Sequence, residues 1–124
     1  MNYKCYIVDD EMHGINLVSD YIKESDDLEI VGTANDPRLA LDQINLLKPD
    51  IVFTDINMPY ISGIELAKKI KDFAFVVFVS ADRSYSHPEI DLEKNIYLTK
   101  PLRLQKFLDA VLEIKSRLTL KKTI

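Results

Sequence analysis

The chain has 124 residues, of which 47% are hydrophobic and 29% are charged, and its net charge is −4. This composition is typical of a globular domain with a hydrophobic core and excludes a disordered chain. The negative charge argues against nucleic-acid binding by this domain, and no apolar run approaches the roughly 20 residues of a membrane span. The one cysteine, Cys5, excludes an internal disulfide and fits a reducing cytoplasm, where we expect the protein.

The first half of the chain predicts strands that alternate with helices. Apolar runs predict strands over residues 4–8, 28–33 and 51–54. Helical spacing of apolar residues follows the first two strands, to about residue 24 and over residues 36–48. Asp36 suits the N-cap position of the second helix, and Pro37 suits its first helical position.

The second half continues this alternation. Helical spacing covers residues 63–70, and a continuous apolar run predicts a strand over residues 75–79 that is covered on both faces. A short strand over residues 96–98 then precedes a final helix over about residues 104–118. The predicted apolar stripe of that helix consists of Leu104, Phe107, Leu108, Val111, Leu112 and Leu118.

Five successive pairs of strand and helix predict an α/β fold, in which an open, doubly wound parallel sheet carries helices on both faces. Ligands bind such sheets at the carboxyl ends of the strands. No repeat or internal linker interrupts the pattern, so we expect a single domain over residues 1–124. Residues 119–124 are either the end of the last helix or the start of a linker.

Chemically reactive side chains follow the strands at this predicted edge. Asp9 and Asp10 follow the first strand, Asp55 follows the third, Ser80 ends the fourth, and Lys100 follows the fifth. In a parallel sheet, three carboxylates, a hydroxyl and an ammonium group would then share one pocket. A charge at the end of a buried strand is costly unless it is paired or has a chemical role.

The predicted carboxylate cluster indicates a divalent cation. Each pair of carboxylates at short range repels by several kcal/mol at an effective dielectric constant of about 20. Mg²⁺, which prefers oxygen ligands, relieves that repulsion, whereas zinc is disfavoured because no sulfur or histidine follows these strands. A metal beside Lys100 and Ser80 would hold the oxygens of a phosphoryl group, which makes Asp55 the candidate nucleophile that forms an acyl phosphate.

Four short motifs occur in order along the chain: Val8-Asp9-Asp10-Glu11, Asp55-Ile56-Asn57-Met58-Pro59 with Gly63, Ser80-Ala81, and Lys100-Pro101. Each motif is weak alone, but together they resemble the receiver domain of bacterial two-component response regulators over essentially the whole chain. Among receivers, the chain is most similar to those that precede LytTR-type DNA-binding domains. The resemblance implies a flavodoxin-like sheet of five parallel strands in the order 2-1-3-4-5.

The resemblance also implies a role for each matching residue in a magnesium-dependent phosphoacceptor site. Asp55 corresponds to the phosphoacceptor. Asp10 and Asp55 would bind Mg²⁺ directly, together with the backbone carbonyl of Asn57, while Asp9 would act through water. Lys100 would pair with the phosphoryl group, and the Lys100–Pro101 bond is often cis in this family.

Further positions match residues that respond to phosphorylation in the family. Ser80 would hydrogen-bond the phosphoryl group, and Tyr97 matches the aromatic residue that moves inward when that hydroxyl shifts. Ala81 leaves room for the incoming phosphodonor. Asn57 and Asp82 match the positions that tune the lifetime of the phosphoryl group.

The function implied is that of a phosphorylatable receiver. A sensor histidine kinase would transfer its phosphoryl group to Asp55, and the modified site would change a homodimer or partner surface. A DNA-binding effector domain outside this chain would make it the N-terminal part of a transcriptional regulator. The domain would not be an enzyme in the usual sense, since it catalyses only its own phosphorylation and dephosphorylation.

The segment over residues 82–95 departs from the family pattern. The family places its fourth helix there, but Pro88 costs about 3 kcal/mol in the interior of a helix. We therefore expect a short helix beginning near Pro88 or an irregular segment. His87, beside this proline, is interpreted as a loop residue.

Three alternatives stay open. A pseudo-receiver that signals without phosphorylation is opposed by the acidic pair, Asp55 and Lys100. A haloacid-dehalogenase-like phosphatase needs a second aspartate two residues after its nucleophile, where this chain has Asn57. A flavin-binding module shares the sheet topology but needs a phosphate-binding loop, and no such loop follows the first strand.

Overall fold

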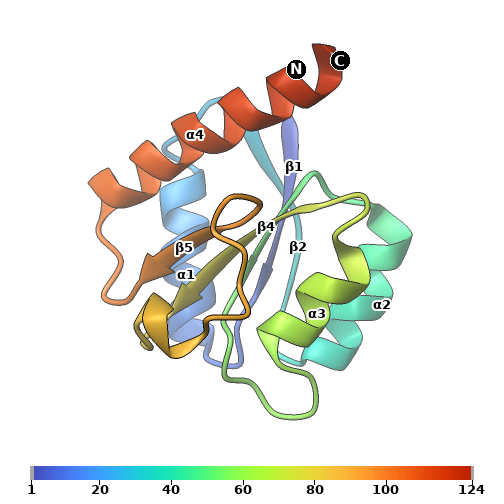
Figure 1. Cartoon of the computed structure of the whole chain (residues 1–124). Helices are drawn as coiled ribbons and strands as arrows, with labels where there is room; N and C mark the ends of the chain where they lie inside the picture. Colours follow the sequence, from blue (N-terminus) through green and yellow to red (C-terminus); the bar gives the residue numbers. More distant parts are fainter. Residues whose placement is uncertain (1, 124) are drawn as a thin grey trace.

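The structure is a computed structural model that describes residues 2–123. Strands alternate with helices along the described chain, except between the last two strands, where only one turn of 3₁₀-helix forms (Figure 1). The elements are β1 (Tyr3–Val8), α1 (Met12–Ile22), β2 (Leu28–Ala34), α2 (Pro37–Leu47), β3 (Ile51–Thr54), α3 (Gly63–Ile70), β4 (Phe75–Ser80), η1 (Ser84–Ser86), β5 (Ile96–Thr99) and α4 (Leu104–Thr123).

The five strands form one parallel sheet in the order β2-β1-β3-β4-β5, which confirms the predicted fold class. The register aligns the carboxyl ends of the central strands. Val8 of β1 pairs with Thr54 of β3, and Thr54 pairs with Phe78 of β4. The residues that immediately follow β1 and β3, Asp9 and Asp55, therefore lie side by side at one edge of the sheet.

Helices cover both faces of the sheet, with α1 and α4 on one face and α2 and α3 on the other (Figure 1). Side chains along β1 alternate between two hydrophobic cores: Cys5 and Ile7 pack towards α1 and α4, whereas Tyr6 and Val8 pack towards α2 and α3. Both faces are buried, which explains why the strands appear in the sequence as continuous apolar runs.

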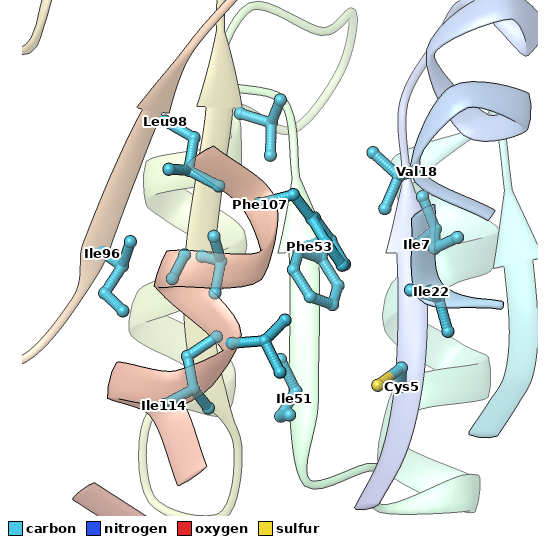
Figure 2. Packing of buried hydrophobic residues seen from close by; sticks show 14 of the residues in the cluster. Cys5, Ile7, Val18, Ile22, Ile51, Phe53, Ile96, Leu98, Phe107 and Ile114 are labelled. Atoms are coloured by element: carbon cyan, nitrogen blue, oxygen red, sulfur yellow. The ribbon is translucent and has the colours of Figure 1, made fainter. Parts of the chain in front are cut away.

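The core under α1 and α4 is centred on Phe107, whose ring stacks on Phe53 of β3 at a centroid distance of 5.5 Å (Figure 2). The predicted stripe of α4 is wrong at its margin, because Leu112 is 65% exposed and Leu104 is 36% exposed. The buried face instead consists of Phe107, Ala110, Val111 and Ile114. A stripe drawn through every leucine is wider than the strip of helix that the sheet can cover.

The segment between β4 and β5 is irregular, as expected, but its single turn of 3₁₀-helix ends before Pro88 rather than beginning there. Two contacts hold the segment against the fold. Ile90 packs against the core under α2 and α3, and the Arg117 guanidinium donates a 2.9 Å hydrogen bond to the carbonyl of Glu93. The path of the segment is therefore fixed without an α-helix.

The last helix extends further than predicted. α4 continues through residues 119–123, and residue 124, the last of the suggested linker start, lies outside the described residues. Among the described residues, no helix is both long enough and apolar enough to cross a membrane.

Two residues of the predicted α4 stripe, one buried and one exposed, provide a test of the packing. Phe107→Ala should lower the free energy of unfolding by about 3–5 kcal/mol, because it leaves a cavity beneath the sheet. Leu112→Ala should change it by less than about 0.5 kcal/mol, because that side chain is exposed. Urea titrations of the two variants measure the difference, and equal losses would contradict this packing.

Candidate functional site

Three carboxylates meet at the carboxyl edge of the sheet. Asp9 and Asp10 follow β1, Asp55 follows β3, and one oxygen atom of each lies within 4.8 Å of the others. Asp9 is 4% exposed and Asp55 is 9% exposed, whereas Asp10 faces solvent. The sheet register alone accounts for this grouping, as the sequence predicted.

Lys100 supplies the one positive charge paired with this cluster among the described residues. Its Nζ atom lies 3.0 Å from Oδ2 of Asp9 and 3.1 Å from Oδ2 of Asp55. The backbone N–H of Lys100 donates to the carbonyl of Ser80, which ties the end of β5 to the end of β4. The Lys100–Pro101 peptide bond is cis, as the family resemblance implied.

The pKa shifts at the site reflect its burial and the ion pairs of Lys100. Burial raises the pKa of Asp9 above its usual value, and the hydrogen bonds from Lys100 and from the Glu11 N–H only partly oppose this. Burial acts to lower the pKa of Lys100, but its hydrogen bonds to Asp9 and Asp55 outweigh this effect, so that its pKa is raised. A cation held by these oxygens would relieve the remaining repulsion, and carboxylate oxygens are the ligands that Mg²⁺ prefers.

The backbone around Asp55 holds its carboxylate in place. The N–H of Ile56 donates to Oδ1 of Asp55 at 2.7 Å. The loop after β3 then folds back so closely that a Cβ atom at Gly63 would lie 2.0 Å from the carbonyl oxygen of Asp55. A glycine is therefore required at the start of α3, which explains its place in the motif.

Asp10 and Asp55 line a cavity of about 570 Å³. Four of the residues that the sequence assigned to the phosphoryl group or its donor line this cavity: Asp55, Ser80, Ala81 and Lys100. Asn57 also lines the cavity, so residues predicted to hold Mg²⁺ meet there. The cavity is large enough for a phosphoryl group and for a metal ion bound beside it.

The predicted response residues converge on Asp82 rather than on Asp55. The side chain of Ser80 is fully buried, and its hydroxyl accepts a hydrogen bond from the Asp82 N–H at 3.3 Å. The hydroxyl of Tyr97 donates to the Asp82 carbonyl at 2.6 Å, and the Asn57 amide donates to the Asp82 carboxylate at 2.7 Å. Asp82 thus connects the loops after β3 and β4 with β5.

Two residues near the site were not predicted from the sequence. His87, interpreted as a loop residue, pairs with Asp82 through Nε2 at 2.9 Å. Gly14 in α1 is buried against Asp9, and a Cβ atom there would lie 2.0 Å from Oδ2 of Asp9. Neither carried a sequence signal, since a loop histidine and a helical glycine are both common without any function.

The fold and the site define a receiver domain. The chain matches the sequence profile of the response regulator receiver domain over residues 5–112, and it belongs to this family of two-component signalling proteins. The LytTR association does not follow from this match and stays a prediction.

Individual relatives agree with this assignment. The transcriptional regulatory protein YpdB of Escherichia coli is 37% identical over 101 residues, which are 79% of this chain and 41% of YpdB. The chain therefore spans about two fifths of that relative's length.

Solved structures share the fold. The response regulatory domain of mrkE from Klebsiella pneumoniae has a TM-score of 0.81 and 29% identity, with 92% of this chain and 96% of that chain covered. A chain of the CheX–CheY–BeF₃–Mg²⁺ complex from Borrelia burgdorferi has a TM-score of 0.79 and 27% identity, with 90% and 88% covered.

Asp9→Asn should stabilise the protein in the absence of Mg²⁺, because the raised pKa of Asp9 means that its charged form is unfavourable in the folded state. The stabilisation should be greatest at neutral pH and should vanish at acidic pH, where the parent carboxylate is protonated in both states. The same change should reduce the stabilisation by Mg²⁺, because it removes a negative charge from the cation site. Thermal unfolding with and without Mg²⁺ measures both effects, and a variant less stable than the parent in metal-free buffer at neutral pH would contradict this account.

Gly14→Ala should disturb the site even though alanine favours helices by about 1 kcal/mol. The added methyl group would displace the Asp9 carboxylate and weaken its ion pair with Lys100. We expect weaker Mg²⁺ binding, measured by calorimetry, and less stabilisation than helix propensity alone predicts. Asn16→Ala, at an exposed position of the same helix, is the control and should leave Mg²⁺ binding unchanged. Equal affinities in the two variants would show that Gly14 has no part in placing Asp9.

Proposed function

We propose that this domain is a phosphoacceptor receiver, which takes a phosphoryl group from a sensor histidine kinase onto Asp55 in a reaction that requires Mg²⁺. The observation that carries the proposal is the placement of Asp55 beside Lys100, Asp9 and Asp10, at a cavity that Asp55, Asp10 and Lys100 line. A nucleophile, a cationic partner for phosphoryl oxygens and a set of metal ligands are thereby present together.

The transfer uses the carboxylate of Asp55 as the nucleophile. One of its oxygens bonds to phosphorus, the bond between phosphorus and the donor breaks, and the product is an acyl phosphate. The Ile56 N–H and the ammonium group of Lys100 orient the carboxylate before the attack. When bound by Asp10, Asp55 and the Asn57 carbonyl, Mg²⁺ would neutralise charge on the phosphoryl oxygens. Lys100 can then move from the carboxylates to those oxygens.

The response to phosphorylation would pass through Ser80 and Tyr97. Ser80 lies at the floor of the cavity and can turn its hydroxyl towards a phosphoryl group on Asp55. That turn would break its hydrogen bond with the Asp82 N–H, and Asp82 also holds the Tyr97 hydroxyl. A change at Asp55 therefore reaches β5, which borders the dimer or partner surface that we expect to respond.

The wider role follows from the same assignment. The E. coli relative is a transcriptional regulatory protein more than twice as long as the matched region. By analogy, we propose that this receiver controls a DNA-binding effector domain, in the cytoplasm and with a histidine kinase as its donor. The domain itself would turn over only its own phosphoryl group and would not be an enzyme in the usual sense.

The site gives less support to two of the alternatives, the pseudo-receiver and the phosphatase. A pseudo-receiver has no need for three clustered carboxylates and a lysine, since their repulsion costs stability. A phosphatase of the haloacid-dehalogenase type needs a carboxylic acid where Asn57 lies, and the Asn57 side chain is already bonded to Asp82.

Intact-mass spectrometry tests the proposal. Incubation with Mg²⁺ and acetyl phosphate should add the mass of one phosphoryl group to the parent protein. Asp55→Asn should show no addition, because an amide is not a nucleophile of this kind, and removal of Mg²⁺ with EDTA should abolish addition to the parent. Asp42→Asn is the matched control, since it removes a carboxylate from α2, away from the site, and should be modified like the parent.

The alternatives predict different results. Rapid and continuous consumption of acetyl phosphate without an adduct would favour the phosphatase. The absence of both an adduct and Mg²⁺ binding would contradict the proposed function.

A further inference from the structure

Asp82, in the loop after β4, is held by four hydrogen bonds. Its N–H and carbonyl bond to Ser80 and Tyr97, while Oδ2 of its carboxylate is shared by the Asn57 amide at 2.7 Å and by His87 Nε2 at 2.9 Å. The two side-chain bonds form a bridge from Asn57 through Asp82 to His87. The donors lower the pKa of Asp82, with Asn57 contributing most and His87 next, so its carboxylate stays ionised and remains an acceptor.

The local fold brings His87 to this position. The turn of η1 returns the chain towards the end of β4, and the N–H of His87 bonds to the carbonyl of Ser84 at 3.0 Å. Pro88 restricts the backbone directly after it, and Ile90 packs into the core. The imidazole is only 16% exposed, although it lies in a segment with little regular structure.

The bridge lies beside the phosphoacceptor cavity. Asn57 belongs to the loop after β3, and Asp82 belongs to the loop after β4. Asn57 lines the cavity, and so do Ser80 and Ala81, which directly precede Asp82. The bridge therefore joins the two loops on the side of the cavity where β3 and β4 end. Because the Asn57 amide and the Asp82 carboxylate bond to each other, both are restrained from binding a water molecule that approaches Asp55.

We propose that His87 is a positioning residue, which holds Asp82 against Asn57 so that the bridge slows hydrolysis of the acyl phosphate on Asp55. This inference rests on the proposed function and adds to it a residue that sets the lifetime of the phosphoryl group. His87 does not touch the reacting atoms, and its effect is exerted entirely through Asp82.

The step that the bridge slows is attack by water on phosphorus. The water oxygen bonds to phosphorus, the bond between phosphorus and the Asp55 carboxylate oxygen breaks, and inorganic phosphate leaves with Asp55 as a free carboxylate. The proton of the water passes to solvent. A freed Asp82 carboxylate or Asn57 amide can orient that water, so loss of His87 should accelerate hydrolysis.

The lifetime of the phosphorylated protein tests the inference. The protein is loaded with acetyl phosphate and Mg²⁺, the donor is removed by desalting, and the decay of the adduct is followed by intact mass. His87→Ala should shorten the lifetime by about two- to tenfold, the range that loss of one hydrogen bond produces. Ser86→Ala, an exposed neighbour in η1, is the control and should keep the parent lifetime. Thermal unfolding in parallel verifies that each variant is folded.

A double-mutant cycle distinguishes positioning of Asp82 by His87 from a general loss of order in the segment between β4 and β5. If His87 acts through Asp82, then His87→Ala should have no further effect in an Asp82→Ala background. His87→Gln, which can still donate an N–H to Asp82, should restore a lifetime closer to that of the parent.

The outcomes are distinct. An unchanged or longer lifetime in His87→Ala, or an effect that persists in the Asp82→Ala background, would overturn the role of His87 and leave the proposed function in place. Failure of the parent to take up a phosphoryl group would overturn both.

Discussion

The repulsion among Asp9, Asp10 and Asp55 is the constraint on which the rest of the structure depends. Three carboxylates within 4.8 Å of one another are opposed in the folded protein by one ammonium group, that of Lys100. Such a cluster costs stability, and the burial that raises the pKa of Asp9 adds to that cost. The fold offsets it by burying two extensive cores, one on each face of the sheet. The cluster would attract a divalent cation, and under the proposed function that cation and Lys100 would hold the anionic phosphoryl group.

The parallel sheet places other functional groups beside this cluster of carboxylates. Its register brings the ends of β1, β3, β4 and β5 to one edge, so that acceptor, metal ligands, hydroxyl and lysine arise from separate parts of the chain. Gly14 leaves space for the carboxylate of Asp9, and Gly63 leaves space for the backbone carbonyl of Asp55. Beyond these, Asp82 links the site to Tyr97 on β5. Hydrogen bonds through Asp82 thus connect the loop after β3 with β5, although no α-helix lies between β4 and β5 among the described residues.

The sequence predicted those features that depend on strong local patterns. The bounds of β3 and α3 were predicted to the residue, because Asp55 with Pro59 and Gly63 with its apolar spacing mark them clearly. Leu112 was misplaced, since spacing shows that a helix has an apolar side but not how wide a strip the sheet covers. The proposed role of His87 depends on a 3₁₀ turn and on a side-chain contact with Asp82, five residues earlier, and neither has a sequence signature. Gly14 was missed because it matters only through the space that it leaves for the Asp9 carboxylate, and a sequence pattern does not show that contact.

The most direct test of the account is a crystal structure of the protein grown with Mg²⁺ and beryllofluoride, an analogue of the phosphoryl group. We predict beryllium bonded to a carboxylate oxygen of Asp55, Mg²⁺ held by Asp10, Asp55 and the Asn57 carbonyl, and the Lys100 ammonium on the fluorine atoms. Bound Mg²⁺ with beryllofluoride absent from Asp55, or neither group at this edge of the sheet, would contradict the claim that the charge cluster is a phosphoacceptor site.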